Sequence, residues 1–256
     1  MLRKYSNHRT YLDNLKLGTL SAFSAGMVNV LSVIIFFAFT SNITGHYAIL
    51  AQEISKGNWI QAAVVFLWIL IFFTGSMFSN LLIIHGNSYV GRYLAHAIPI
   101  IIETICILIV GVYLQFFYTE TLYETELLVT LLLFAMGLQN GLTASISNGS
   151  VKTTHLTGLT TDLAITLSML TKEQFRNDIK VREKGKLLFS IMIAYMLGAI
   201  ISGILYYEIK YYTFYIVCLT LCIVMSYDYY KLNITKYLFK GAYLLKKISS
   251  KDEENQ

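Results

Sequence analysis

The sequence has few charged residues: they make up 14% of its 256 positions, whereas 55% are hydrophobic. A soluble domain carries about a quarter charged residues, so this composition excludes an ordinary soluble protein and predicts an integral membrane protein. The net charge of +5 does not indicate a nucleic-acid partner. Nearly all basic residues fall in loops and tails, where membrane topology explains them.

Proline and cysteine are also scarce. Pro99 is the single proline, so only one predicted helix could be kinked by the proline route. The three cysteines, Cys106, Cys218 and Cys222, all lie in apolar runs, and their positions give neither a disulfide framework nor a zinc spacing. We therefore expect no metal and no cofactor.

The sequence motifs of several enzyme classes are missing. The chain has no HExxH, GxSxG, Walker A or GxGxxG motif. Its histidines are scattered, without the spacing of metal ligands. These absences weaken an enzymatic function without removing it, and we expect that the protein is not an enzyme.

Long apolar runs dominate what the chain does contain. A helix that spans a membrane needs about 20 mostly apolar residues, and six runs qualify. They are 17–39, 59–84, 93–118, 127–147, 187–207 and 211–230. The runs predict an all-α, polytopic membrane protein. It would have a polar N-terminal segment at 1–16, one integral membrane domain at 17–230 and a basic tail at 231–256.

The distribution of lysine and arginine predicts the orientation. With both termini on the cytoplasmic side, the inner segments hold 18 basic residues, and the outer segments hold only Lys56 and Lys210. Because basic residues are retained on the cytoplasmic side, this count favours both termini inside. No signal peptide is evident, and we expect a multi-pass protein of the cytoplasmic (inner) membrane.

One polar stretch inside the apolar domain has a weaker copy near the N-terminus. The segment 137–166 reads GLQNGLTASISNGSVKTTHLTGLTTDLAIT, and its GLQN and HLTG motifs match GMVN at 26–29 and NITG at 42–45. The two motifs are 19 residues apart in the first copy, counted from Gly26 to Gly45, and 21 residues apart in the second. The spacing nearly holds, which favours a true duplication.

The duplication extends to a third position. The pair Gly75 and Ser79 in the second run corresponds to the pair Gly198 and Ser202 in the fifth. Each pair forms a small-xxx-small face on which helices approach closely. The chain therefore divides into two halves, 17–118 and 127–230. Each half has three helices, so the second would enter the membrane from the opposite side. Inverted repeats of this kind are typical of several secondary transporters.

Asn29 and Asn140 are equivalent positions in the two copies, and each falls on the small-residue face of its helix. Polar residues at membrane depth are costly and are commonly functional, so both are candidate solute-binding residues. The alternative is that they only hydrogen-bond between helices and hold the bundle together. The residues alone favour neither reading.

The Thr-Gly motifs at Thr44 and Thr157 each precede a short apolar stretch of about half a bilayer. One interpretation is a pair of broken or half-helices whose N-termini point toward the midplane, where their free N–H groups would favour an anionic solute. The other is an amphipathic helix on each membrane face. Gln139 and Asp162 complete the set of predicted binding residues.

The third run contains two candidates for proton or ion coupling, Glu103 and His96. They are seven residues apart and share one stripe of the predicted helix. Glu103 lies some ten residues into the helix, where an acid is a candidate proton or cation carrier. An internal hydrogen bond or salt bridge to a neighbouring helix is the slightly favoured explanation of this residue.

At these motifs the sequence resembles the YoaK-like family, a group of bacterial membrane proteins of unknown function. The matching segments are AGMVN at 25–29, NITG at 42–45 and MGLQN at 136–140, followed by Thr153-Thr154 and by LTG at 156–158. The resemblance covers about 17–230 and implies a six-helix inner-membrane protein. Two positions depart from the family pattern: this chain has Asn29 where Asp is usual and His46 where Asn is usual. If those positions bind a proton or cation, the departures imply altered coupling.

Three functions remain in order of preference. The first is a permease for a small solute, with its site between two inverted repeats. The second is a non-transporting membrane scaffold that binds a partner, and the third is an intramembrane enzyme. The expected partners are the lipid bilayer and an unknown solute, with no nucleic acid. The sequence does not decide between a monomer and a homo-oligomer.

Overall fold

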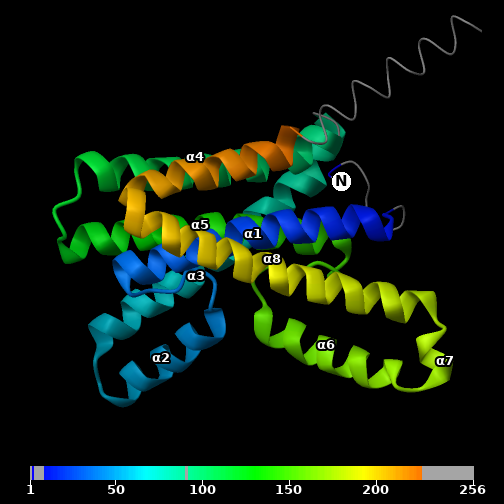
Figure 1. Ribbon diagram of the computed structural model, residues 1–256. Coiled ribbons are helices and arrows are strands. Elements are labelled where there is room, and N and C mark those ends of the chain that lie inside the picture. Colours follow the sequence, from blue (N-terminus) through cyan, green and yellow to red (C-terminus); the bar gives the residue numbers. More distant parts are fainter. Residues whose placement is uncertain (1, 3–8, 90–91, 227–256) are drawn as a thin grey trace, which may run out of the picture.

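The computed structural model describes residues 2, 9–89 and 92–226, and all regular structure within them is helical (Figure 1). Capping residues and glycines set the helix ends. The elements are α1 (Tyr11–Phe36), α2 (Ile43–Ser55), α3 (Trp59–Tyr89), α4 (Arg92–Phe116), α5 (Leu122–Ser147), α6 (Leu156–Leu170), α7 (Glu173–Arg176), α8 (Ile179–Ile209) and the 3₁₀ turn η2 (Lys210–Tyr212). A further helical segment occupies 213–226. The predicted tail lies outside the described residues.

Five helical segments of the described chain are long and apolar enough to cross a membrane, which makes this a multi-pass membrane protein. The first four match the first four predicted runs. The fifth, Ile179–Ser226, covers both remaining runs, so the count is five where the sequence predicts six. This segment is not straight, because Lys210 has a left-handed φ of 50° and the chain turns there.

After that turn the chain runs back beside α4 (Figure 1). The Tyr93 hydroxyl, near the start of α4, donates to the carbonyl of Met225 at 2.9 Å. Near the end of α4, Gln115 accepts from the hydroxyl of Tyr215 at 2.8 Å. The contacts run in opposite chain directions, so segment 213–226 is antiparallel to α4.

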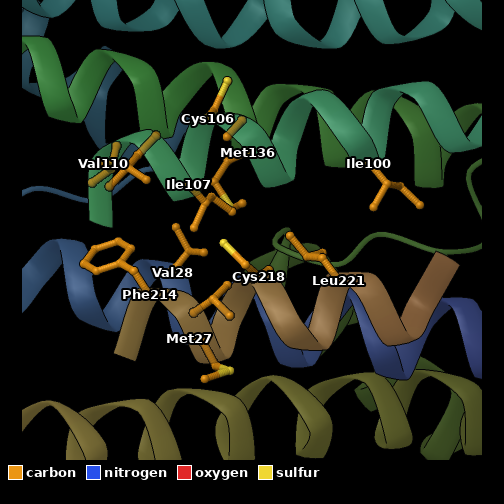
Figure 2. Close-up of a cluster of buried hydrophobic side chains, with 14 of the residues drawn as sticks. Met27, Val28, Ile100, Cys106, Ile107, Val110, Met136, Phe214, Cys218 and Leu221 are labelled. Atoms are coloured by element: carbon orange, nitrogen blue, oxygen red, sulfur yellow. The ribbon is translucent and has the colours of Figure 1, made fainter. Parts of the chain in front are cut away.

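A buried apolar cluster joins α1, α4, α5 and segment 213–226 (Figure 2). Met27 and Val28 come from α1, Ile107 from α4, Met136 from α5 and Phe214 from the last segment. Inside a bilayer, such packing rather than water exclusion holds helices together. This cluster is the core around which the long helices pack.

The helices of the two halves match in length and in the way they end. α1 and α5 each have 26 residues and begin with a threonine capping box, at Thr10 and Thr121. Each ends at a residue in the left-handed conformation, Phe37 with φ 54° and Asn148 with φ 52°. α3 and α8 each have 31 residues.

The long helices cross at glycines. A Cβ atom at Gly26 of α1 would overlap the backbone of α8 at Tyr195, and one at Gly198 would overlap the backbone of α1. In the same way Gly75 of α3 and Gly137 of α5 lie against each other's helix. Glycine is required at these points because any side chain would force the backbones apart. The predicted close approach at Gly75 and Gly198 is therefore present.

The short helices α2 and α6 begin in the middle of the molecule and run outward in opposite directions (Figure 1). The loops 37–42 and 148–155 lead back from the ends of α1 and α5 to these starting points. The N-termini of both short helices therefore lie toward the middle of the molecule (Figure 1).

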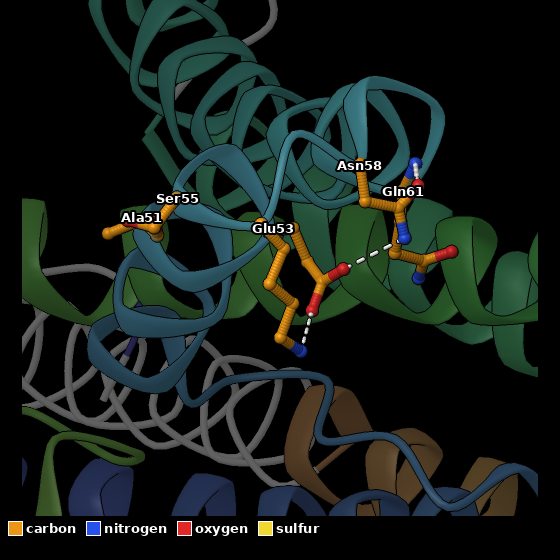
Figure 3. A network of polar contacts seen from close by, with 6 residues as sticks. Ala51, Glu53, Ser55, Asn58 and Gln61 are labelled. Carbon is orange, nitrogen blue, oxygen red and sulfur yellow. Dashed lines mark hydrogen bonds and ion pairs between the residues drawn. The ribbon is translucent and has the colours of Figure 1, made fainter.

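The outward end of α2 is fixed by Glu53. Its Oε1 accepts from Lys56 Nζ at 2.8 Å, and its Oε2 accepts from Asn58 Nδ2 at 2.9 Å (Figure 3). Gly57, with φ 72°, makes the turn between α2 and α3. The lysine and asparagine bonds hold the pKa of the Glu53 carboxyl below its ordinary value.

Candidate functional site

A cavity of about 510 Å³ lies where the N-termini of α2 and α6 meet. Side chains from α1, α5, α3 and α8 complete its wall. The lining residues are Asn29, Phe39, Ser41, Asn42, Ile43, Thr44, Tyr47, Phe72, Asn140, Thr154, His155, Leu156, Thr157 and Tyr195. Four of the predicted binding residues are thus brought into one cavity: Asn29, Thr44, Asn140 and Thr157.

The lining consists largely of pairs of equivalent residues from the two halves. Twelve of the fourteen residues pair when the Asn, Thr-Gly and glycine-crossing motifs are aligned. The pairs are Asn29 with Asn140, Ser41 with Thr154, Asn42 with His155, Ile43 with Leu156, Thr44 with Thr157, and Phe72 with Tyr195. The cavity therefore lies where the two copies of the duplicated motif meet.

Asn29 joins α1 to the loop that leads to α2. Its Nδ2 donates to Ser41 Oγ at 2.6 Å, and its Oδ1 accepts from the backbone N–H and the hydroxyl of Thr40 at 3.2 and 3.0 Å. The Asn29 side chain is 3% exposed. Its amide is thus largely used in holding the loop, which favours a structural role alongside any binding role.

Asn140 makes the equivalent link in the second half with fewer bonds. Its Oδ1 accepts from the hydroxyl of Thr154 at 2.8 Å, and its Nδ2 donates to the carbonyl of Met136 at 2.8 Å. The residue is only partly buried. An amide oxygen has two lone pairs and an amide nitrogen two hydrogens, so Asn140 keeps capacity for a solute.

The two helix starts differ in their caps. Asn42 Oδ1 accepts from the backbone N–H of Gly45 at 3.1 Å, whereas His155 makes no side-chain cap bond to α6. The first N–H groups of a helix have no partner within it, so those of Leu156 and Thr157 depend on an external acceptor. The start of α6 therefore offers free donors beside the cavity.

The cap residues also explain the glycine of each Thr-Gly motif. A Cβ atom at Gly45 would lie 2.7 Å from the side-chain nitrogen of Asn42. One at Gly158 would lie 2.6 Å from the imidazole ring of His155. The glycines leave room for the cap side chains to fold over the helix ends.

The cavity wall exposes more apolar than polar surface and carries no acidic side chain. Among the described residues that line it, none is Asp, Glu, Lys or Arg. Apart from the imidazole of His155, its electrostatic character therefore comes from the N-terminal ends of α2 and α6, which carry partial positive charge. Such a site favours a solute with negative charge or strong hydrogen-bond acceptors.

Two predicted residues, Gln139 and Glu103, lie outside this cavity and are buried between the long helices. Gln139 of α5 is 2% exposed, and its Nε2 donates to Glu103 Oε1 of α4 at 3.0 Å and to Ser24 Oγ of α1 at 2.8 Å. Glu103 is fully buried. Gln139 therefore does not line this cavity, because the residue next to Asn140 on a helix points about 100° away from it.

Asp162 and His96 also lie elsewhere. Asp162 lines a second cavity, of about 670 Å³, together with the basic residues Lys180 and Lys184 of α8. His96 is buried, and its Nδ1 contacts the carbonyl oxygen of Leu2. His96 and Glu103 lie on one stripe of the predicted helix, but in the structure they make separate contacts.

Sequence reasoning missed several lining residues: Ser41, Thr154, Phe72 and Tyr195. Ser41 and Thr154 directly precede the aligned cap residues, so the duplication itself could have identified them. Phe72 and Tyr195 each stand three positions before an aligned glycine, Gly75 or Gly198. In the sequence they resemble ordinary lipid-facing aromatic residues, and only the crossing of the helices shows that they line the cavity.

A family model described as "Protein of unknown function (DUF1275)" matches residues 17–227. The match covers almost the whole predicted membrane domain and agrees with the resemblance to the YoaK-like family. The comparisons with curated proteins and with solved structures give no match.

Proposed function

The chain belongs to the DUF1275 family of proteins of unknown function, and we propose that it is a permease that moves a small solute across the cytoplasmic membrane. The observation that carries this proposal is the central cavity, with its six pairs of equivalent residues. Its volume of about 510 Å³ falls within the range of small-molecule sites, roughly 300–1,000 Å³.

The proposed architecture is an inverted repeat of two three-helix halves, with α8 and segment 213–226 as separate crossings. Its support is the matched lengths of α1 with α5 and of α3 with α8, and the matched glycine crossings. α2 and α6 would then be half-helices that end at opposite membrane faces. In transporters of this kind, solute sites lie near the midplane between the repeats and at the ends of broken helices.

The proposed orientation places both termini in the cytoplasm. Lys56 follows the last residue of α2, and Lys210 follows the last residue of α8. The ends of these two helices lie toward one end of the molecule, and α7, which is part of the basic segment 172–186, lies at the other (Figure 1). Basic residues favour the cytoplasmic side, so the end with α7 would be inside.

The proposed solute is a small anion. The uncapped start of α6 and the absence of acidic residues from the described lining favour negative charge. Asn140 and the hydroxyls of Thr44 and Thr157 would supply further hydrogen bonds to the solute. The rings of Phe72 and Tyr195 would contact its apolar part.

The test is solute binding and flux with purified protein in proteoliposomes. A panel of small carboxylates and phosphates should include at least one that raises the thermal unfolding temperature and is taken up. Asn140→Leu should remove both effects. Thr161→Val is the matched control, because Thr161 is an exposed residue of α6 one turn beyond Thr157.

A scaffold function is the second candidate, since the bonds of Asn29 to Thr40 and Ser41 already explain that residue structurally. If no anion binds, and if Asn140→Leu lowers stability without changing any flux, the scaffold is the better account.

A further inference from the structure

Glu103 is a buried acid that the proposed solute cavity does not use. It lies on α4, one turn before Cys106, which belongs to the buried apolar cluster of Figure 2. An isolated carboxylate in such a place is very costly, and buried acids commonly become neutral instead. The side chains around Glu103 therefore decide whether its carboxyl group is ionised or protonated.

Glu103 is hydrogen-bonded to α5 and is connected through that bond to α1. Gln139 Nε2 of α5 donates to Glu103 Oε1 at 3.0 Å and to Ser24 Oγ of α1 at 2.8 Å. Ser24 in turn donates to the carbonyl of Ser21 at 3.0 Å. Two buried atoms of this group have no hydrogen-bond partner: Glu103 Oε2 and Gln139 Oε1.

One added proton would satisfy both atoms. An ionised carboxylate and an amide oxygen are both acceptors, so neither can serve the other. A protonated Oε2 is a donor, and Gln139 Oε1 belongs to the amide that already donates to Glu103. The neutral acid and the amide can then face each other through two hydrogen bonds.

We propose that Glu103 and Gln139 form a proton-binding site inside the membrane domain, and that this proton is co-transported with the solute of the central cavity. The co-transport rests on the proposed permease function, whereas the protonation of Glu103 does not.

Among the described residues, no basic side chain faces Glu103 as a counter-charge. Cys106 on its own helix and Cys218 on segment 213–226 are the titratable groups that interact with it. Gln139 of α5 contacts Glu103, and Ser24 of α1 contacts that glutamine; neither side chain ionises. His96, two turns earlier on α4, contacts Leu2. The described residues include no group of three or more His, Cys, Asp or Glu side chains that could hold a metal ion.

The proton site is linked to the cavity through α5. Gln139 contacts Glu103, and the next residue, Asn140, lines the cavity. Release of the proton leaves a carboxylate beside the oxygen of Gln139, so the interface of α4 and α5 must open to water or shift. A shift of α5 moves Asn140 as well. A proton would also balance the charge of a bound anion.

The first test is infrared difference spectroscopy of the full chain in liposomes at neutral pH. The wild-type protein should show the carbonyl band of a protonated carboxylic acid, and Glu103→Gln should lack it. Glu126→Gln, in the first turns of α5, is the matched control and should keep the band. A wild-type protein without a Glu103-dependent band would overturn the proton site, whether or not any solute is transported.

A second variant keeps the test decisive if Glu103→Gln fails to fold. Gln139→Leu removes the acceptor of the proposed O–H bond and should shift the carboxylic band to higher frequency. An unchanged band would contradict the pairing of the two residues.

The coupling is tested by flux of whichever panel anion the wild-type protein carries. Glu103→Gln mimics the protonated form, so uptake driven by a pH gradient should fall to the level of protein-free vesicles while solute exchange persists. Uptake driven by a sodium gradient instead, or unchanged pH-driven uptake, would overturn the coupling. If no variant or wild type moves an anion, the permease fails while the infrared result still decides the proton site.

Discussion

Asn29 and Asn140 occupy the same place in two helices of equal length, and both line one cavity. Asn29 stands 18 residues after the first residue of α1, and Asn140 stands 18 residues after the first residue of α5. Their hydrogen bonds differ, however. Asn29 has three bonds to its own loop, and Asn140 has one bond to the equivalent loop.

This difference predicts unequal effects of substitution. Asn29→Leu should lower the stability of the folded protein by about 2–4 kcal/mol, because the donors of Thr40 and the hydroxyl of Ser41 lose a buried partner. Asn140→Leu should cost about 1 kcal/mol, since it removes one bond between a loop and a partly buried residue. Thermal unfolding in detergent, followed by circular dichroism, measures both. Equal losses would argue against the structural asymmetry of the two sites.

Thr157→Val tests the hydroxyl beside the uncapped start of α6. The variant keeps the shape of the side chain and removes its hydrogen-bonding group, so solute binding should fall while stability stays within about 0.5 kcal/mol of the wild type. Thr161→Val makes the same change one turn away on an exposed position. Binding that is lost in both variants, or in neither, would remove Thr157 from the site.

The glycine crossings predict a sharp contrast within α8. Gly198→Ala should destabilise by about 3 kcal/mol or more, because its methyl group would meet the backbone of α1 at Phe23. Gly203→Ala should be neutral or stabilising by up to about 1 kcal/mol, because its methyl group would make only an ordinary contact with Val30. The yield of folded protein and the unfolding temperature in detergent check this. A tolerated Gly198→Ala would contradict the close crossing of α1 and α8.

The orientation can be tested by labelling single cysteines in a cysteine-free chain in intact cells. An impermeant thiol reagent should modify Lys56→Cys and Leu122→Cys, and it should not modify Lys180→Cys until the cells are opened. All three positions are exposed, so access to the side chain is not limiting. Modification of position 180 from outside would exclude the proposed six-crossing arrangement.

The turn after α2 predicts an acid-dependent loss of stability. Bonds from Lys56 and Asn58 lower the pKa of Glu53 in the folded protein, so they stabilise the fold at pH values above the ordinary glutamate pKa of 4.5. That contribution disappears as the pH falls below 4.5 and through the lowered folded-state value. Glu53→Gln should lack this part of the pH dependence. Unfolding temperatures of both proteins from pH 7 to pH 3 give the comparison, and parallel curves would show that Glu53 contributes nothing.

Much of this protein can be predicted from the sequence because its strongest signals are local. Apolar runs of membrane length identified the first four long helices, since every backbone polar group in a bilayer must be satisfied within a helix. The repeated motifs identified Asn29, Asn140, Thr44 and Thr157 as equivalent positions, and these four lie in one cavity. The recurrence of small residues located the crossings at Gly75 and Gly198.

Other features depended on the tertiary structure. The sequence predicts a break between its last two apolar runs near Lys210, but only the structure shows that the chain turns there and runs back along α4. Gln139 and Asn140 are adjacent in sequence, yet the helix directs one into the core and the other into the cavity. Asp162 is only five residues from Thr157 but lies in a different cavity, because α6 carries it away from the centre.

The sequence by itself thus determined the class of protein, the long helices and the pairs of equivalent residues, because composition and repeated motifs are properties of the chain. Only the tertiary structure decided which of those residues share a cavity and which face the core. The physical reason is that the packing of the long helices decides the direction in which each side chain points, and not only its depth in the membrane. The packing of α1 on α8 and of α3 on α5 brings the starts of α2 and α6 together, and no local pattern records that meeting.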